Sequence, residues 1–329
     1  MVISRTPLRM SFVGGGTDYP EYYRRWGGEV ISTPIDYYIT VEVSESSDNR
    51  IYLDYLYDNE VVDSVSRIKH DILRECLKYT GYDSGIRIAV TTDLPVVGSG
   101  LGSSSALTVG TLLALYTYSG VKKSQYRIAN DACEIELKIL GRPNGKQDQF
   151  GTAIGGFKHI KFNSDFYKPC SDVVVYNFDI CKNRKLELRN NLMLFYTGVQ
   201  RQADDILQEQ VDNTVSNYDS LHKCKNTVAE MKKVLLCDNI SLDYFAVILD
   251  EYWHSKRKLA SSITNGFFDE VYDKAMDSGA IGGKILGAGG GGFFLFYVKP
   301  ESQYSVRKAL GEFTEFRFGF DDDGVKIVE

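Results

Sequence analysis

Two glycine-rich stretches, nearly two hundred positions apart, constrain this chain more than any other feature. The first is GSGLGSSSA at residues 98–106, and the second is GAGGGG at residues 287–292. Glycine has no Cβ, so backbone amides in such stretches can approach an oxygen atom closely, and consecutive N–H groups at a helix start form an anion site. The two stretches therefore predict backbone contacts with an anionic ligand, most simply the phosphates of a nucleotide.

Length and charge narrow the class of protein. A chain of 329 residues exceeds the size at which one core keeps growing, so two domains or one large α/β unit are expected. The 38 basic and 44 acidic residues give a net charge of −6, which argues against nucleic acid or an anionic membrane as the main partner. Six scattered cysteines without a CxxC pattern are typical of reduced thiols in the cytoplasm. The sequence shows no apolar run of membrane length and no signal-peptide pattern, and it leaves the oligomeric state open.

Hydrophobic periodicity predicts a strand, a glycine loop and a helix in succession. Residues 30–44 and 51–57 have strand character, and residues 66–79 have helical spacing. A strand over 86–95 leads into the first glycine stretch, and a buried helix starts at Ser103. This order is the one that an anion site at a helix N-terminus needs.

The rest of the chain alternates helices and strands. The pattern predicts the elements in this order: a helix over 125–140, strands over 157–162, 173–178 and 192–197, a helical region over 202–263 with one break near 238–242, a helix over 268–278, the strand FFLFYV, a helix near 302–312 and two short final strands. A soft boundary near residue 190 divides the chain into domains 1–190 and 191–329.

Two common nucleotide motifs do not fit. Gly287, Gly289 and Gly292 satisfy the GxGxxG spacing of dinucleotide-binding folds, but that motif must open a helix and this one runs into FFLFYV, a strand. The first stretch has Ser103 where the same motif needs glycine, and neither stretch is followed by the GK[ST] of a P-loop. A dinucleotide-dependent oxidoreductase is therefore the weaker alternative.

Three stretches together resemble a known family. RTPLRMSFVGGGTD (5–18), PVVGSGLGSSSA (95–106) and KILGAGGGGF (284–293) are similar, in order and spacing, to the three signature motifs of the GHMP kinases, named for galactokinase, homoserine kinase, mevalonate kinase and phosphomevalonate kinase. GGGTDYPEYY, YTGVQRQADDIL and GAIGGKILGAGGGGFF resemble more closely the bacterial kinases of D-glycero-D-manno-heptose 7-phosphate.

The resemblance implies a fold and a reaction. The implied fold is α+β, with two layers and an active-site cleft between an N-terminal and a C-terminal domain. The implied reaction uses ATP and Mg²⁺ to phosphorylate the anomeric oxygen of the heptose 7-phosphate, a small-molecule sugar phosphate, on the route to GDP-heptose and surface polysaccharide. The alternatives are a GHMP kinase for galactose, fucose or an amino sugar, and a catalytically silent sugar-sensing relative.

The same resemblance implies which residues form the nucleotide and metal sites. The expected nucleotide contacts are Gly98, Ser99, Gly100, Leu101, Gly102, Ser103, Ser104 and Ser105. A serine-capped helix after a flexible turn is the structural alternative for this stretch. Mg²⁺ prefers few protein oxygens beside phosphate oxygens, and the family pattern maps its ligands onto Ser104 and Glu136, with Glu134 as the neighbouring possibility.

Catalysis and substrate binding are assigned in the same way. Asp148 matches the family's aspartate at the reacting hydroxyl and Arg9 the basic residue beside it, although the two could form only a structural ion pair. Because a carboxylate can accept two hydroxyl groups, Thr17 and Asp18 are expected to recognise the sugar. Phosphate recognition favours ammonium or guanidinium groups, and the candidates for the sugar's own phosphate are Lys146, Lys158 and Arg201. The remaining substrate contacts expected are Gly16, Gly289 and Gly290.

Overall fold

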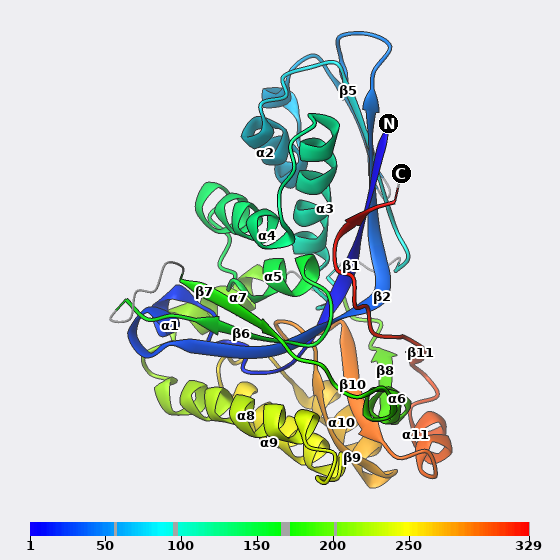
Figure 1. Cartoon of the computed structure of the whole chain (residues 1–329). Helices are drawn as coiled ribbons and strands as arrows, with labels where there is room; N and C mark the ends of the chain where they lie inside the picture. Colours follow the sequence, from blue (N-terminus) through cyan, green and yellow to red (C-terminus); the bar gives the residue numbers. More distant parts are fainter. Residues whose placement is uncertain (56–57, 95–97, 166–171, 201–202, 329) are drawn as a thin grey trace.

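The computed structural model describes residues 1–55, 58–94, 98–165, 172–200 and 203–328, which form two β-sheets and the helices packed on them (Figure 1). The eight-stranded sheet has the order β12-β1-β2-β5-β3-β4, with β6 paired to β2 and β7 paired to β6. Its strands are β1 (Val2–Val13), β2 (Gly28–Glu45), β3 (Ile51–Tyr55), β4 (Asp58–Val62), β5 (Ile86–Thr92), β6 (Lys158–Phe162), β7 (Val173–Asn177) and β12 (Lys326–Ile327). The four-stranded sheet has the order β11-β8-β10-β9, with β8 (Leu192–Tyr196), β9 (Ala280–Ile285), β10 (Phe293–Val298) and β11 (Thr314–Phe316).

Helices pack on the strands of both sheets. In chain order they are α1 (Pro20–Trp26), the 3₁₀ helix η1 (Val65–Arg67), α2 (Asp71–Thr80), α3 (Ser103–Tyr118), α4 (Gln125–Cys133), the π-helix η2 (Glu134–Ile139), α5 (Gln147–Ala153), α6 (Lys182–Asn191), α7 (Asp204–Asp212), α8 (Tyr218–Leu236), α9 (Asp243–Lys256), α10 (Gly266–Asp277) and α11 (Gln303–Ala309). Helices α3 and α5 pack on β1 and β2, and α2 and α4 pack outside them (Figure 1). The predicted mixture of helices and strands is confirmed.

The long strand β2 joins two parts of the first sheet. Its residues 28–32 pair with β6 and its residues 39–45 pair with β5, while β1 pairs antiparallel with it along most of its length. The register between β1 and β2 shifts after Pro7 and again after Ser11. Such irregularities bend a strand and redirect its side chains, and Arg9 lies between the two.

The strand, loop and helix predicted around the first glycine stretch are confirmed. Strand β5 ends at Thr92, and α3 begins at Ser103. Most of α3 is buried, because the sheet covers one side of it while α2, α4 and α5 cover the others. Its apolar residues therefore lie all round the helix rather than on one stripe.

The helix predicted over 125–140 changes its winding partway. It begins as α4, capped by the Ser124 side chain, and continues as the π-helix η2 from Glu134. A π-turn widens the helix and is frequent at functional sites. This wider turn carries Glu136.

The predicted helical region 202–263 contains one more break than expected, and the helices α5 and α6 were not predicted. The region divides into α7, α8 and α9, with turns at 213–217 as well as at 237–242. Helix α5 has only seven residues, too few to show a helical period, and α6 has the sequence KNRKLELRNN, which is mostly polar and so gives no apolar stripe. Only three residues of α6 are buried, which explains the weak signal.

The apolar strand β10 is buried on both faces. Its residues Phe293, Leu295 and Tyr297 belong to the core shared with the first sheet, and Phe294 and Phe296 belong to a second core with α10. A strand covered on both sides reads as a continuous apolar run, as FFLFYV does.

The chain's last strand does not stay with the second sheet. The predicted boundary at residue 190 falls between β7 of the first sheet and β8 of the second, but β12 pairs antiparallel with β1. The expected domain 191–329 would have kept this tail with the second sheet, whereas Ser4 and Arg5 hold it on the first (Figure 1). Among the helices of the described residues, none has both the length and the apolar character needed to cross a membrane.

Candidate active site

Segments from the beginning, middle and end of the chain line one pocket. Its walls come from the end of β1, residues 98–105, the start of α5, the start of α7, and residues 286–291. Arg9, Asp18 and Asp148 all line it, although more than a hundred positions separate Asp148 from the other two. The predicted convergence of the three motifs is confirmed.

The first glycine stretch turns sharply into α3. Gly98, Gly100 and Gly102 have φ angles of 70°, 75° and 78°, in the left-handed region that favours glycine. Gly102 is the N-cap of α3 and makes no side-chain cap, so the first N–H groups of the helix keep their donors for a ligand. The alternative of a serine-capped helix is therefore wrong.

Seven of the eight residues expected to contact the nucleotide line the pocket. The exception is Leu101, whose side chain is buried and whose carbonyl accepts the Arg9 N–H at 2.9 Å. Ser99 and Ser103 share a hydroxyl hydrogen bond of 3.0 Å, which holds the turn against the helix. Ser104 is exposed at the pocket wall.

The second glycine stretch is a hairpin loop between β9 and β10. It runs into an antiparallel strand, as expected, so it does not open the helix that a dinucleotide site requires. A Cβ at Gly287 would lie 2.5 Å from Gly100 Cα, and one at Gly100 would lie 2.5 Å from Leu286 O. The two loops can touch only because both positions are glycine. Gly289 lines the pocket, whereas Gly290 is not among its lining residues and donates its N–H to Ile263 O at 2.8 Å.

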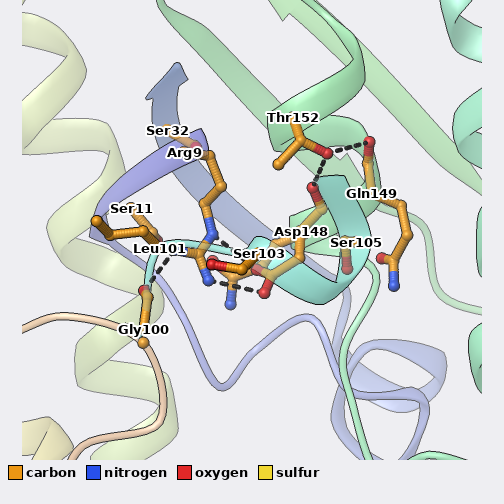
Figure 2. Close-up of polar contacts among 12 residues, drawn as sticks. Arg9, Ser11, Ser32, Gly100, Leu101, Ser103, Ser105, Asp148, Gln149 and Thr152 are labelled. Atoms are coloured by element: carbon orange, nitrogen blue, oxygen red, sulfur yellow. Dashed lines mark hydrogen bonds and ion pairs between the residues drawn. The ribbon is translucent and has the colours of Figure 1, made fainter. Parts of the chain in front are cut away.

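Arg9 and Asp148, which both line the pocket, form a bidentate ion pair (Figure 2). Arg9 Nε donates to Asp148 Oδ1 at 2.8 Å and Nη2 donates to Oδ2 at 2.7 Å. Arg9 Nη1 donates to the Gly100 carbonyl at 2.7 Å, so the same guanidinium reaches the first glycine stretch. Arg9 is buried, but the Asp148 side chain keeps 25% of its surface exposed toward the pocket. The pair is therefore open to a ligand on the carboxylate side.

The two neighbours Thr17 and Asp18 have different surroundings. Asp18 lines the pocket, and its carboxylate accepts N–H groups from Gly16 at 3.0 Å and from the Gln147 backbone and side chain at 3.2 and 3.0 Å. Burial and the nearby Asp148 raise the pKa of Asp18, while the backbone N–H groups of Gly16 and Gln147 lower it. The Thr17 hydroxyl is buried, shares its single proton between Gly14 O at 2.7 Å and Glu29 O at 3.0 Å, and accepts from Glu29 N. Thr17 fixes the loop, and Gly16 and Asp18 line the pocket.

Glu136 lies beneath the start of α3. It is fully buried, and its Oε2 accepts from the Ser105 hydroxyl at 2.9 Å and from Gln149 Nε2 at 3.0 Å. Its Oε1 has no hydrogen-bond partner among the described residues, and burial raises the pKa of Glu136 to about 7. Ser104 is exposed at the pocket wall, whereas Glu136 is not among the lining residues and is linked to the wall through Ser105. Glu134, the other candidate, pairs with Lys138 at 2.7 Å.

The lysines proposed for the sugar's phosphate lie elsewhere. Lys146 forms an ion pair with Asp172, and Lys158 is buried with its Nζ donating to Gly151 O at 3.2 Å. Neither is among the residues that line the pocket. Arg201 lies outside the described residues, so that assignment stays a prediction.

Two pocket lysines were not selected by the sequence analysis. Lys284 lies next to the second glycine stretch in sequence, but a lysine there could equally well only flank a strand. Lys256 is the last residue of a helix, and nothing in the sequence around it indicates a pocket residue. Both are buried and line the pocket. Burial lowers the pKa of each, and for Lys284 the charges of Lys256 and Arg9 lower it further.

Comparisons with known proteins agree with this arrangement. Residues 65–156 match the N-terminal domain of the GHMP kinases, and residues 234–315 match their C-terminal domain. D-glycero-alpha-D-manno-heptose 7-phosphate kinase of Campylobacter jejuni is 30% identical over 98% of this chain and 97% of its own. The solved structure of a D-glycero-D-manno-heptose 1-phosphate kinase from Bacteroides thetaiotaomicron has a TM-score of 0.81 at 27% identity, covering 100% of this chain and 99% of its own. L-fucokinase/L-fucose-1-P guanylyltransferase of Bacteroides fragilis is 28% identical over 95% of this chain but only 36% of its own.

Proposed function

Because the chain belongs to the GHMP kinases and is an ATP-dependent sugar kinase, we propose that it transfers the γ-phosphate of ATP to the anomeric (C1) hydroxyl of D-glycero-D-manno-heptose 7-phosphate. The observation that carries this proposal is the 30% identity over nearly both whole chains with a kinase named for that substrate. The product would be a heptose 1,7-bisphosphate, an intermediate for GDP-heptose and surface polysaccharide. A kinase also needs a compartment that supplies ATP, so a cytoplasmic location is part of the proposal.

The nucleotide's phosphates are assigned to residues 98–105. Three left-handed glycines and an uncapped helix start present N–H groups along one wall of the pocket. The dipole of α3 adds favourable potential for an anion at that end. No lysine or arginine occurs in this stretch, so backbone donors would supply most of the binding.

Asp148 and Arg9 are assigned to the acceptor hydroxyl. Phosphoryl transfer needs alignment of donor and acceptor and neutralisation of charge more than covalent chemistry. The exposed side of the Asp148 carboxylate can orient the C1 hydroxyl and accept its proton, and the Arg9 guanidinium stabilises that carboxylate. Arg9 also contacts Gly100 O, which would link the acceptor's position to the nucleotide loop.

Asp18 and the two loops around it are assigned to the sugar. Its carboxylate is fixed by N–H groups from two directions and lines the pocket, so it can accept hydroxyl groups in a defined orientation. Such a fixed acceptor rejects a substrate that lacks the matching hydroxyl. Gly16 and Gly289 allow backbone to approach the sugar closely.

Mg²⁺ is the proposed metal, with the exposed Ser104 hydroxyl as one ligand and Glu136, which is not among the lining residues and contacts Ser105, as the second expected ligand. The buried, unpartnered Oε1 of Glu136 fits a role as an oxygen ligand, and Mg²⁺ takes few protein oxygens when phosphates supply others. When bound, the ion would neutralise charge on the phosphate oxygens. Ser105 would position Glu136 through the hydrogen bond to Oε2.

A substrate screen tests the proposal. ADP release would be measured across free sugars and sugar phosphates, with phosphorus NMR of each product. We expect turnover with the heptose 7-phosphate and a product whose new phosphorus signal couples to the anomeric proton. Turnover of galactose or fucose without turnover of the heptose 7-phosphate would overturn the named substrate, and the similarity to a fucokinase makes fucose the most informative comparison.

A further inference from the structure

Two buried ammonium groups lie in the pocket without an anionic partner. Lys256, at the end of α9, is 5% exposed, and Lys284, in β9, is 1% exposed. Both line the pocket, and among the described residues neither has a carboxylate oxygen within ion-pair distance. Burying an ammonium group without a counter-ion costs free energy. The burial of this pair therefore suggests that a ligand supplies the counter-ion.

Backbone carbonyls hold both groups in place. Lys284 Nζ donates to Ser11 O at 2.9 Å and to Phe12 O at 3.1 Å, and Lys256 Nζ donates to Gly287 O at 2.7 Å. An ammonium has three donors, so one donor of Lys284 and two of Lys256 remain without an acceptor among the residues described. These donors are sufficient for the oxygens of one phosphate group.

The other cations of the pocket and the carboxylate of Asp18 are already engaged, whereas Asp204 is exposed at the pocket wall. Arg9 is paired with Asp148, and Arg142 donates to Asp71 at 2.9 Å. The carboxylate of Asp18 accepts three N–H groups from Gly16 and Gln147. In the described part of the pocket, Lys256 and Lys284 are thus the cations without an ion pair.

The attachments of Lys284 place it beside the loop that carries Asp18, and Lys256, bonded to Gly287 O, lies between that loop and Gly100. The Tyr252 ring lies 4.4 Å from Lys284 Nζ and 6.0 Å from Lys256 Nζ, measured to its centroid, and the Tyr252 hydroxyl donates to Gly15 O at 3.1 Å. Gly15 belongs to the loop that carries Asp18. The carbonyls of Ser11 and Phe12 lie just before the same loop, whereas the proposed nucleotide wall at 98–105 has its own N–H donors.

We propose that Lys256 and Lys284 together bind the phosphate group that the acceptor carries before the reaction. This inference rests on the proposed function, because it assigns a place to the second phosphate of that substrate. A dianion between the two ammonium groups supplies the missing counter-charge. It also replaces Lys146 and Lys158, whose side chains point to other partners.

Steady-state kinetics with matched acceptors test the inference. The wild type, Lys256→Met and Lys284→Met would each be measured with heptose 7-phosphate and with the same heptose lacking its phosphate. We expect each substitution to raise the KM for the phosphorylated acceptor by about tenfold or more, with little change in KM for the free sugar. Lys225→Met is the matched control, because Lys225 Nζ also donates to a backbone carbonyl, Trp26 O at 2.6 Å, but is not among the lining residues.

Two outcomes overturn the inference. An equal fall in kcat with both acceptors would mean that the lysines act on the transferred phosphoryl group. An unchanged KM for the phosphorylated acceptor in folded variants would mean that they do not bind it. A wild type that turns over only free sugars contradicts the proposed function separately.

A second measurement needs no variant and no assumption about the sugar. Inorganic phosphate added to the wild type should inhibit competitively against the acceptor and not against ATP, because the two lysines would bind it. Competition with ATP alone would overturn the inference even if the lysine variants fail to fold.

Discussion

The two walls of the pocket hold charge in different ways. The wall formed by residues 98–105 is neutral, built from glycines, serines and the N–H groups that start α3. The second wall is ionic, with Arg9, Asp18, Lys256 and Lys284 buried and Asp148 half-buried. Backbone donors are present whatever the side chain, so the neutral wall suits a ligand common to the whole family. The ionic wall depends on individual side chains, and it is where specificity for the acceptor can be changed.

The largest effect expected is at the centre of the ionic wall. Asp148→Asn should lower kcat by roughly 10² to 10⁴, because the amide accepts a proton poorly, while the chain stays folded. Steady-state kinetics and thermal unfolding check this together. Asp269→Asn is the control, since Asp269 also pairs with an arginine, Arg257 at 2.6 Å, but is not a lining residue. If both variants lose only stability, Asp148 is a structural partner of Arg9 and the ionic wall is not catalytic.

The neutral wall is most sensitive at its contact with the second glycine loop. Gly100→Ala places a methyl group 2.5 Å from Leu286 O at a φ of 75°, whereas Gly81→Ala has a similar φ of 80° and nothing within 4 Å. Both should lose about 1 kcal/mol from backbone strain. Gly100→Ala should lose more and should raise the KM for ATP, since the loops must separate.

Urea unfolding and ATP kinetics on the two glycine variants give the comparison. Equal losses of stability, with unchanged ATP binding in both, would show that contact between the loops does not shape the neutral wall.

Two adjacent residues are expected to have different roles: Asp18 binds the sugar, and Thr17 stabilises the loop. Asp18→Asn should raise the acceptor KM by about tenfold, because one charged acceptor is lost. Thr17→Val should instead lower the free energy of unfolding by about 1–3 kcal/mol, because it removes the hydroxyl bonded to Gly14 O and Glu29 O. Kinetics and urea unfolding of each variant decide between the two effects. A raised acceptor KM in a stable Thr17→Val variant would return Thr17 to the sugar site, as its sequence suggested.

A pH-dependent effect on stability, with no change in activity, is expected at Lys158, a buried lysine that belongs to neither wall. Burial lowers its pKa to about 7 from 10.5, so between pH 7 and 10.5 the folded chain binds fewer protons there than the unfolded chain. The contribution of Lys158 to stability therefore rises with pH across this window. Lys158→Met should remove that dependence, so its stability relative to wild type should be higher at pH 6 than at pH 9 by about 2 kcal/mol.

Urea unfolding at both pH values measures the difference between the two proteins, in which the other titrating groups largely cancel. A difference independent of pH would mean that the Lys158 ammonium is already compensated in the folded chain. It would then be a poor reference for the unpaired lysines of the ionic wall.

Local features of the fold could be predicted from the sequence. Glycine and serine in residues 98–105, after a β-branched strand and before an apolar helix, specify a phosphate-type turn because those backbone angles and that periodicity are local properties. The same reasoning rejected a dinucleotide site, since FFLFYV has strand composition. The sequence did not predict α6, which is polar, or α5, which has only seven residues and carries Asp148. The joint burial of Lys256 and Lys284 could not be predicted, because nothing near either residue in sequence differs from an exposed lysine.

The sequence by itself determined the order of the elements, the two glycine loops, the family resemblance and the pairing of Arg9 with Asp148 as candidates. Tertiary structure alone decided which side chains reach the pocket: Asp18 but not Thr17, Lys256 and Lys284 but not Lys146 or Lys158. Tertiary structure also decided that β12 pairs with β1 of the first sheet. The reason is physical. Backbone geometry follows from neighbours in the chain, whereas the direction and burial of a long charged side chain follow from packing between segments that the sequence holds far apart.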